Sequence, residues 1–418
     1  MIRTIATDAG ANLALQAVSV VLGVVIGVTL SRLLGADGLG VYAFAMSLAT
    51  LLATVARMGL TTLVVREVAV GKERGDWAEV VGLVSWAQWA TASVSVGIGA
   101  IVVAIASLLA MPETFWTVCA AMLLLVAMSV TWVLGSALRG LNAVVVANIP
   151  FQIVRPGLAL VGIGVLSWTS LDRPQLAMGV EAGAWFVAGL VAWWFWRGRV
   201  PVAPPTQAYS PRKWLTAALP LLVLDGLLMT MHQSDVLMLK WMSTDASTGI
   251  YSIVAQLGRF TALILVVANS VISPRFAALH EAGQRQDLQN LVRLSARAVT
   301  VLTAVVAAGL LGFGEAFLTF YSPGFEVGYT ALVVLVAGQA INAMAGSVGY
   351  LMIMTGHDRD VAWVSAGVAL LNVALNIALI PAFDMLGAAL ASAVSVSVWN
   401  VTLAALVRYR LGLNSTAF

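Results

Sequence analysis

Four ionisable side chains are expected at membrane depth within the stretch from Lys213 to Ala278, which forms two long apolar runs. They are Asp225, His232, Asp235 and Arg259. An ionisable group at membrane depth is costly unless it faces a cavity or a partner. Carboxylates can hold cations or protons, an imidazole can titrate near neutral pH, and a guanidinium can bind an anionic group. The stretch therefore predicts either a polar path through a membrane or a set of buried partners.

Arg259 is expected near the centre of the bilayer. It lies 16 residues before Arg275, which corresponds to about 24 Å along a helix. A side chain so far from the interface cannot easily reach it. We therefore expect Arg259 either to face a cavity or to pair with Asp225 or Asp235.

Arg57 is a second candidate inside an apolar run. It lies 9 residues before Arg66, about 14 Å along a helix, so its long side chain can either reach the inner interface or face a cavity. Under the 209-residue repeat described below, Arg259 corresponds to a position seven residues before Arg57, almost two helical turns. The two arginines are then expected on one face at different depths, a stagger that suits the passage of an anionic headgroup.

Arg155 lies between Pro150 and Pro156, which are expected to bend its helix. It either extends the set of cationic cavity residues or binds backbone groups that Pro156 leaves unpaired.

The remaining candidates are less specific. Asp225 lies about 12 residues into its apolar run, and His232 follows two turns later on the same face. Asp225 is expected to be either a proton or cation site or the counter-ion of Arg259, and His232 either titrates or packs as an ordinary histidine. Asp235, nearer the outer surface, is expected to be structural. The candidate sugar contacts are Asn12, Gln16 and Gln256.

Composition shows that membrane helices must position these groups. Of 418 residues, 61% are hydrophobic and 10% charged, against about 25% charged in soluble domains, and the mean hydropathy is +0.96. The single cysteine, Cys119, lies in an apolar run and excludes a disulfide framework. There is no Gly-rich phosphate loop, so nucleotide hydrolysis is not expected. We expect no metal site, no cofactor and no nucleic-acid partner.

Twelve runs of about 20 or more apolar residues can cross the hydrocarbon core. They are 9–31, 39–64, 78–109, 114–137, 143–168, 175–196, 214–240, 247–273, 290–320, 326–354, 361–381 and 386–407. With the N-terminus inside, 16 Lys and Arg residues fall in inner segments and 3 in outer segments. Because basic residues concentrate on the cytoplasmic side, both termini are predicted to be cytoplasmic.

The proline-rich segment from Arg197 to Trp214 cannot continue a helix and divides the chain. We expect a six-helix bundle over 1–199, a cytoplasmic linker over 200–212 and a second six-helix bundle over 213–418. A shift of 209 residues supports a repeat, because it aligns Gly40 with Gly249, Tyr42 with Tyr251, Leu48 with Leu257, Arg66 with Arg275 and Ala69 with Ala278. An even number of spans in each half predicts parallel repeats with a substrate path between them.

Several stretches resemble the oligosaccharide flippase family, the polysaccharide-biosynthesis branch of the multidrug/oligosaccharidyl-lipid/polysaccharide (MOP) exporter superfamily. They are SRLLGADGLGVYAFAMSLATLLATVARMGLTTLVVREVA (31–69), SDVLMLKWMSTDASTGIYSIVAQLGRF (234–260), LVAGQAINAMAGSVGYLMIMTGHDRD (335–360) and GAALASAVSVSVWNVTLAALVRYRLGL near the end. The resemblance covers almost the whole chain. It implies an all-α integral membrane protein with a MATE-like, V-shaped pair of six-helix bundles. The first, second, seventh and eighth spans would line a cavity that opens alternately to each side.

The same resemblance implies a flippase of surface polysaccharide biosynthesis in the bacterial inner membrane. Its substrate would be a polyprenyl-pyrophosphate-linked oligosaccharide, with cationic residues holding the pyrophosphate, polar residues the sugars, and the polyprenyl tail remaining in the lipid bilayer. A coupling ion (H⁺ or Na⁺) and polysaccharide polymerase components are further partners that such a flippase can use. Members that flip the peptidoglycan precursor usually have two extra spans, which this sequence lacks.

Two other functions are considered. A MATE-like drug efflux antiporter would favour an acidic cavity for cationic substrates, and Arg57, Arg155 and Arg259 argue against it. A membrane glycan polymerase or ligase would be an enzyme with an outer catalytic loop, but the predicted outer loops are short and hold no clustered acid, base or nucleophile. We therefore expect no catalytic residue, although a scaffold without transport activity is also compatible with the sequence.

Overall fold

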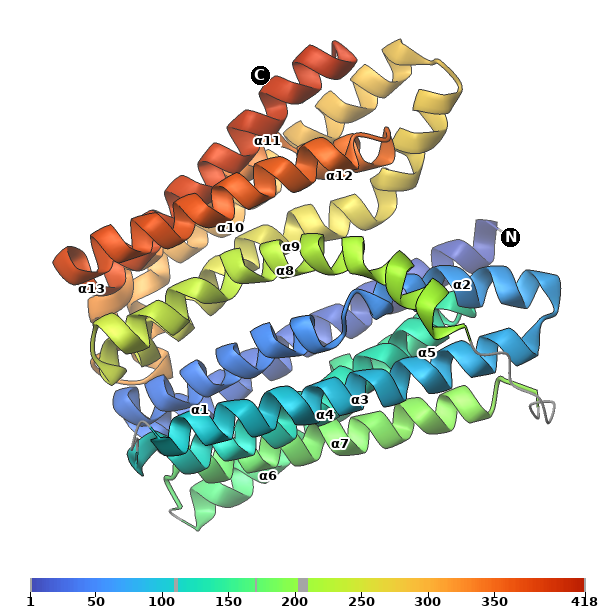
Figure 1. Ribbon diagram of the computed structural model, residues 1–418. Helices are drawn as coiled ribbons and strands as arrows, with labels where there is room; N and C mark the ends of the chain where they lie inside the picture. The colour runs from blue at the N-terminus through green and yellow to red at the C-terminus, as the bar shows by residue number, and fades with distance from the viewer. Residues whose placement is uncertain (1, 109–111, 170, 202–209, 417–418) are drawn as a thin grey trace. The chain divides into compact units, whose positions relative to one another are not determined.

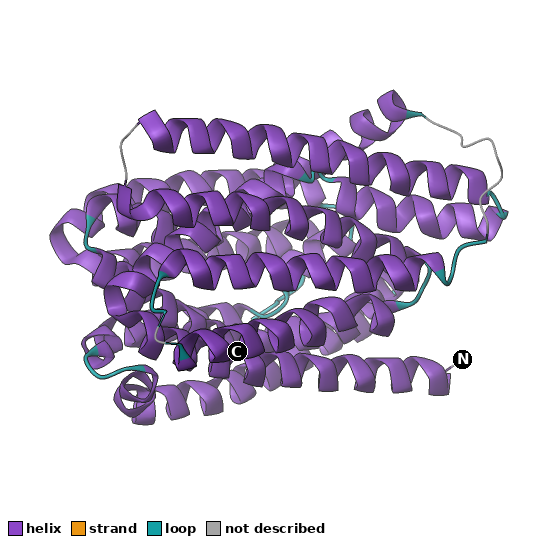
Figure 2. Ribbon diagram, turned by 90° about the horizontal axis from the view of Figure 1, so that it is seen from below, coloured by secondary structure: helices purple, strands orange, loops and turns teal. Residues whose placement is uncertain are grey.

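The computed structural model describes residues 2–108, 112–169, 171–201 and 210–416, and its regular structure in these ranges is entirely helical (Figures 1 and 2). The helices are α1 (Ile2–Ala56), α2 (Leu60–Arg74), α3 (Trp77–Leu108), α4 (Pro112–Gly140), α5 (Val144–Ile149), α6 (Arg155–Trp168), α7 (Pro174–Arg197), α8 (Pro211–Met242), α9 (Asp245–Glu281), α10 (Arg285–Tyr321), α11 (Tyr329–Ala345), α12 (Val348–Met354) and α13 (Asp358–Leu411), with a π-helical turn η1 (Pro150–Val154) and a 3-10 turn η2 (Phe325–Gly328). The all-α prediction is confirmed.

The long apolar helices agree with most of the predicted membrane crossings. In the described residues, 9 helical segments are long and apolar enough to cross a membrane. Two of them belong to α1 and α13, which hold 55 and 54 residues and are each interrupted by one non-helical residue, Gly35 (φ 66°) and Asp384 (φ 51°). Each of these helices therefore provides two crossings. The nine segments thus account for eleven of the twelve predicted crossings, and the crossing in α8 stays a prediction from the sequence.

The turn positions also agree with the 209-residue repeat. Gly35 forms the turn between the first and second crossings. The equivalent position is Thr244, which is the N-cap of α9 and accepts a hydrogen bond from the Ser247 backbone N–H. The same step from one crossing to the next therefore occurs at matched positions in the two halves.

Three local features depart from uninterrupted spans. The second crossing breaks between α1 and α2 at Met58 (φ 50°) and Gly59 (φ 71°). The tenth breaks between α11 and α12 at Gly346 (φ 74°). The bend expected in the fifth crossing is the π-helical turn η1, which begins at Pro150, a residue without a backbone donor.

Gly59 is required by a close helix contact as well as by its backbone angles. A Cβ atom at this position would lie 2.3 Å from the carbonyl oxygen of Ala218 on α8. Only a residue without a side chain allows the broken end of α1 to approach α8 so closely. The break therefore places the turn after α1, which carries Arg57, beside the first half of α8.

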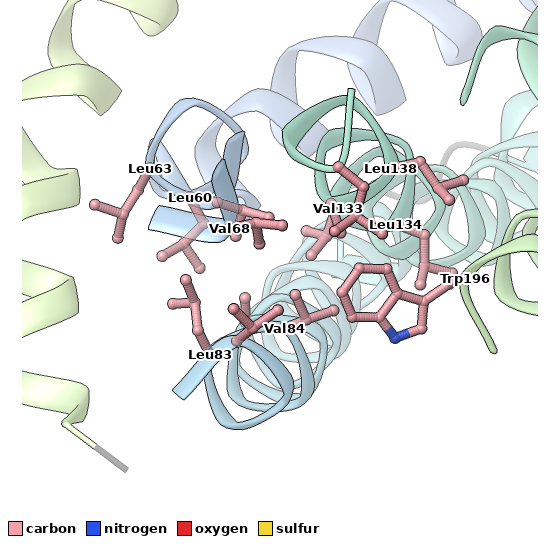
Figure 3. Packing of buried hydrophobic residues seen from close by; sticks show 14 of the residues in the cluster. Leu60, Leu63, Val68, Leu83, Val84, Val133, Leu134, Leu138 and Trp196 are labelled. Carbon is pink, nitrogen blue, oxygen red and sulfur yellow. The ribbon is translucent and has the colours of Figure 1, made fainter. Parts of the chain in front are cut away.

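The chain packs into two compact units, Met1–Met229 and Thr230–Phe418, here called the first and second units. In the first unit, α4 packs against α1, α2, α3 and α7. Figure 3 shows aliphatic side chains of α2, α3 and α4 packed with Trp196 of α7. Trp214 of α8 is 1% exposed in the same cluster, with its ring 5.3 Å from that of Trp86.

The second unit has its own core, formed by residues of α9, α10, α12 and α13 such as Phe276, Leu288, Leu351 and Leu403. The segment after α13 is part of it, because Leu413 is buried there. The domain limits at residues 199 and 213 stay a prediction from the sequence.

Candidate functional site

Arg57, in the turn that follows α1 in the first unit, is held by the last turn of α1 and by an aromatic ring. Its Nε donates to the Ala53 carbonyl at 3.0 Å, and its Nη2 donates to Thr54 Oγ1 at 2.8 Å. The guanidinium carbon lies 5.3 Å from the centre of the Trp132 ring on α4. Thus none of its described hydrogen bonds is to a carboxylate.

A second arginine, Arg139, contacts the same ring, with its guanidinium carbon 5.6 Å from the centre of Trp132. Its Nη2 donates to Ser136 Oγ at 3.1 Å. A cation–π contact stabilises a partly buried guanidinium by roughly 0.5–2 kcal/mol without neutralising its charge. Two positive charges therefore meet at one indole.

The acidic neighbour of this pair is Asp225 on α8, whose carboxylate interacts electrostatically with Arg57. The counter-ion predicted for Asp225 from the sequence is instead Arg259. Asp225 comes near Arg57 because α8 and the end of α1 approach closely at Gly59, a tertiary contact that spacing along the chain does not reveal.

Arg155 has a carboxylate partner that the sequence analysis does not identify. Its Nε donates to Glu181 Oε1 at 2.6 Å, and its Nη2 donates to the same oxygen. The Glu181 side chain is fully buried, whereas that of Arg155 is 28% exposed. The ion pair and a cation–π contact with Trp185, at 5.5 Å, both fix Arg155. Neither predicted alternative includes this pair, although a single acid in the apolar run 175–196 is the signal that could have indicated it.

Aromatic rings join the Arg57 and Arg155 groups inside the first unit. The Phe151 ring lies 4.7 Å from Trp132 and 5.8 Å from Trp185, measured between ring centres. Phe151 belongs to η1, so the π-helical turn positions the middle ring of this series. These three rings are not among the candidates predicted from the sequence, because an aromatic residue in an apolar run ordinarily indicates packing.

The polar amides of the first unit lie on facing helices. Asn148 Nδ2 on α5 donates to Asn12 Oδ1 on α1 at 3.1 Å. Gln16 is half-buried one turn beyond Asn12. Gln152 in η1 has a buried Oε1 without a partner among the described residues. Amides from α1 and the bent fifth crossing are therefore available for hydroxyl ligands, including two, Asn148 and Gln152, that the sequence analysis does not select.

In the second unit, Arg259 lies on α9 with an exposed side chain. It forms neither a hydrogen bond nor an ion pair within the described part of this unit. Its electrostatic neighbours there are His232 and the hydroxyl of Tyr251. His232 is exposed on α8, and Gln256 is half-buried one turn before Arg259.

Asp235 is not the partner of Arg259, because other side chains bind its carboxylate. Tyr251 Oη donates to Oδ2 and Asn376 Nδ2 donates to Oδ1, each at 2.9 Å, and Ser392 Oγ also donates to Oδ2. Asp235 is 5% exposed. Donors from α9 and α13 thus surround a carboxylate of α8, which agrees with the structural role expected for it and leaves the Arg259 charge uncompensated by Asp235.

Comparisons with known proteins identify the fold and the family. A solved inward-facing multidrug resistance MATE family transporter of the MOP superfamily aligns with a TM-score of 0.77 and 14% identity over 97% of this chain and 98% of that one. The lipid II flippase MurJ in an inward closed conformation aligns with a TM-score of 0.72 and 13% identity over 96% and 87%. A MOP superfamily transporter from Pyrococcus furiosus aligns with a TM-score of 0.67 and 14% identity over 97% and 94%.

These identities are low, so the solved structures establish a shared fold, that of MOP superfamily transporters. No curated protein matches the chain. Residues 5–280, more than half of the chain, match the model of the family described as "Polysaccharide biosynthesis protein". The chain belongs to this polysaccharide biosynthesis family and has the MOP transporter fold.

Proposed function

We propose that the protein is a flippase that moves a polyprenyl-pyrophosphate-linked oligosaccharide across the bacterial inner membrane by alternating access, for surface polysaccharide biosynthesis. The observation that carries this proposal is that several arginines in or next to the apolar helices are not bonded to described carboxylates of their own unit. Arg259 has no bonded acidic partner within the described part of its unit, and Arg57 and Arg139 are held by one indole ring. Together with family membership, cations held in this way support an anionic substrate.

The chemistry of the substrate suits these groups. A pyrophosphate carries at least two negative charges, and a hydrogen bond between charged groups contributes roughly 1.5–3 kcal/mol. We assign Arg259 to the attraction of the pyrophosphate, with Arg57 in support. Asn12, Gln16 and Gln256 are proposed contacts for sugar hydroxyls. Arg155 is a weaker candidate than the sequence suggests, because Glu181 already compensates its charge.

This function involves no catalytic residue. A drug efflux antiporter remains the alternative with the same fold, but cations without bonded acids argue against cationic substrates. Asp225 and His232 are the candidates for a coupling ion, and that ion and the polymerase partners stay predictions.

The test of the proposed function is the variant Arg259→Ala. Loss of one charged contact should weaken substrate binding roughly 10- to 150-fold. Export of the surface glycan should therefore stop while the amount of protein in the membrane is unchanged, and Arg259→Lys should keep part of the export. Glycan on the cell surface and protein abundance would be measured together. Arg293→Ala is a matched control, since Arg293 is exposed at the start of α10.

The double variant Arg259→Ala with Asp225→Asn separates binding from a structural role. If Arg259 merely balances Asp225, the single variant loses abundance and the double variant recovers both abundance and export. Recovered export in the double variant would contradict the assignment of Arg259 to the substrate.

The proposed orientation places both termini in the cytoplasm, because 16 basic residues lie in the inner segments and 3 in the outer ones. A phosphatase that is active only outside the cytoplasm should be inactive when fused to the C-terminus. The same enzyme inserted near Pro112 should be active. An active C-terminal fusion would reverse the orientation.

A further inference from the structure

A cluster of aromatic and basic side chains ends α7, on a face that the proposed transport function does not use. The sequence from 193 to 199 is WWFWRGR. The side chains of Trp193 and Trp194 are 45% and 67% exposed. Arg197 and Arg199 follow at the helix end and are also exposed.

Each arginine is held against an aromatic ring of α7. The guanidinium carbon of Arg197 lies 5.1 Å from the centre of the Trp193 ring, and that of Arg199 lies 5.6 Å from the centre of Phe195. Arg199 Nη1 also donates to the Phe195 carbonyl at 3.1 Å. A pocket of about 490 Å³ is lined by Trp194, Phe195, Arg197, Gly198 and Arg199. The two cations thus border one cavity.

Neither cation is neutralised by a described carboxylate. The ion pairs of the first unit involve other basic residues, namely Arg66, Arg155 and Lys213. The segment from Pro201 to Ser210, which follows the cluster, contains no Asp or Glu. Most of the ten guanidinium N–H groups of the two arginines therefore stay available to an anionic ligand.

We propose that this pocket binds the phosphate group of an anionic phospholipid in the cytoplasmic leaflet. Exposed tryptophans are typical of the membrane–water interface, and the proposed topology places this end of α7 on the cytoplasmic side. That leaflet carries a negative surface charge. The indole rings would contact the upper acyl region while the guanidinium groups bind the headgroup phosphate. A lipid supplies both contacts, whereas a soluble phosphate supplies only the second.

The experiment uses the full chain in nanodiscs of phosphatidylcholine with increasing phosphatidylglycerol, followed by native mass spectrometry to count retained phosphatidylglycerol. The wild-type protein should retain one molecule more than the double variant Arg197→Gln with Arg199→Gln. Two lost surface charges should weaken this binding about 30-fold. The matched control is Arg74→Gln with Arg293→Gln, which removes the same charge from exposed positions on α2 and α10.

Each outcome decides the proposal. Retention of the extra phosphatidylglycerol in the control variant but not in the site variant supports it. This result does not depend on whether Arg259 binds the transported substrate. Equal loss in both variants would show diffuse charge attraction and overturn the proposal. If inorganic phosphate, at a concentration equal to that of the lipid phosphate, displaces the retained lipid, the site binds soluble anions and the proposal is overturned as well.

Discussion

Replacing Glu181 by alanine should lower the stability of the first unit by about 3 kcal/mol, the lower end of the range for breaking a buried ion pair. The Glu181 carboxylate is fully buried, and it accepts two hydrogen bonds from Arg155. Without it, the Arg155 guanidinium keeps its charge in a largely apolar setting. We choose the lower end because 28% of the Arg155 side chain is exposed and partly screened.

Thermal unfolding in detergent would measure this effect, with Glu181→Gln expected to be intermediate because an amide oxygen can still accept from Arg155. The double variant Glu181→Leu with Arg155→Leu is the control. Apolar residues in place of both partners are often neutral or stabilising. If the double variant is as unstable as Glu181→Ala, the loss arises from altered packing and the ion-pair explanation is wrong.

A second large loss of stability is expected in the other unit for Asp235→Ala. This change leaves Tyr251 Oη, Asn376 Nδ2 and Ser392 Oγ without their carboxylate acceptor. A buried donor that loses its partner costs roughly 1–3 kcal/mol, so we expect a combined loss of about 3 kcal/mol or more. The Asp235→Asn variant should lose less, since it retains one acceptor oxygen.

The comparison for this prediction is Asp245→Ala in the same unit. Asp245 is 30% exposed and pairs with Lys240 at the turn between α8 and α9. Such ion pairs near the surface contribute about 0–1 kcal/mol. Resistance to proteolysis and the midpoint of thermal unfolding would be measured for both. Equal midpoints for the two alanine variants would show that the Asp235 network does not hold α8, α9 and α13 together.

Most of the fold follows from hydropathy, because a helix that crosses a bilayer needs about 20 apolar residues and shows them in one continuous run. The turn at Gly35 and the bend at Pro150 follow from residue types with special backbone preferences. The break at Met58 and Gly59 does not. Glycine is common in membrane helices, and only the approach of Ala218 on another helix makes a side chain at position 59 impossible.

The sequence indicates which cations belong to the candidate site, but it does not indicate which residues contact them. Depth along a helix identifies Arg57 and Arg259, because arginine is costly wherever it lies far from an interface. Their surroundings depend on tertiary contacts: Trp132 is 75 positions from Arg57, and Glu181 is 26 from Arg155. Sequence spacing therefore indicates which residues need a partner, whereas packing determines which partner they find.

The contacts of Arg57 also bear on the entropy of ligand binding. Two hydrogen bonds to α1 and the contact with the Trp132 ring order its guanidinium before any ligand arrives. Among the described residues of its unit Arg259 has no comparable bonds, so a ligand bound there would have to order that side chain, at a cost of about 0.5–1.5 kcal/mol. The two cations thus differ in preorganisation. In the proposed transport, Arg57 would offer a fixed direction of approach, whereas Arg259 would follow the phosphate group as it moves.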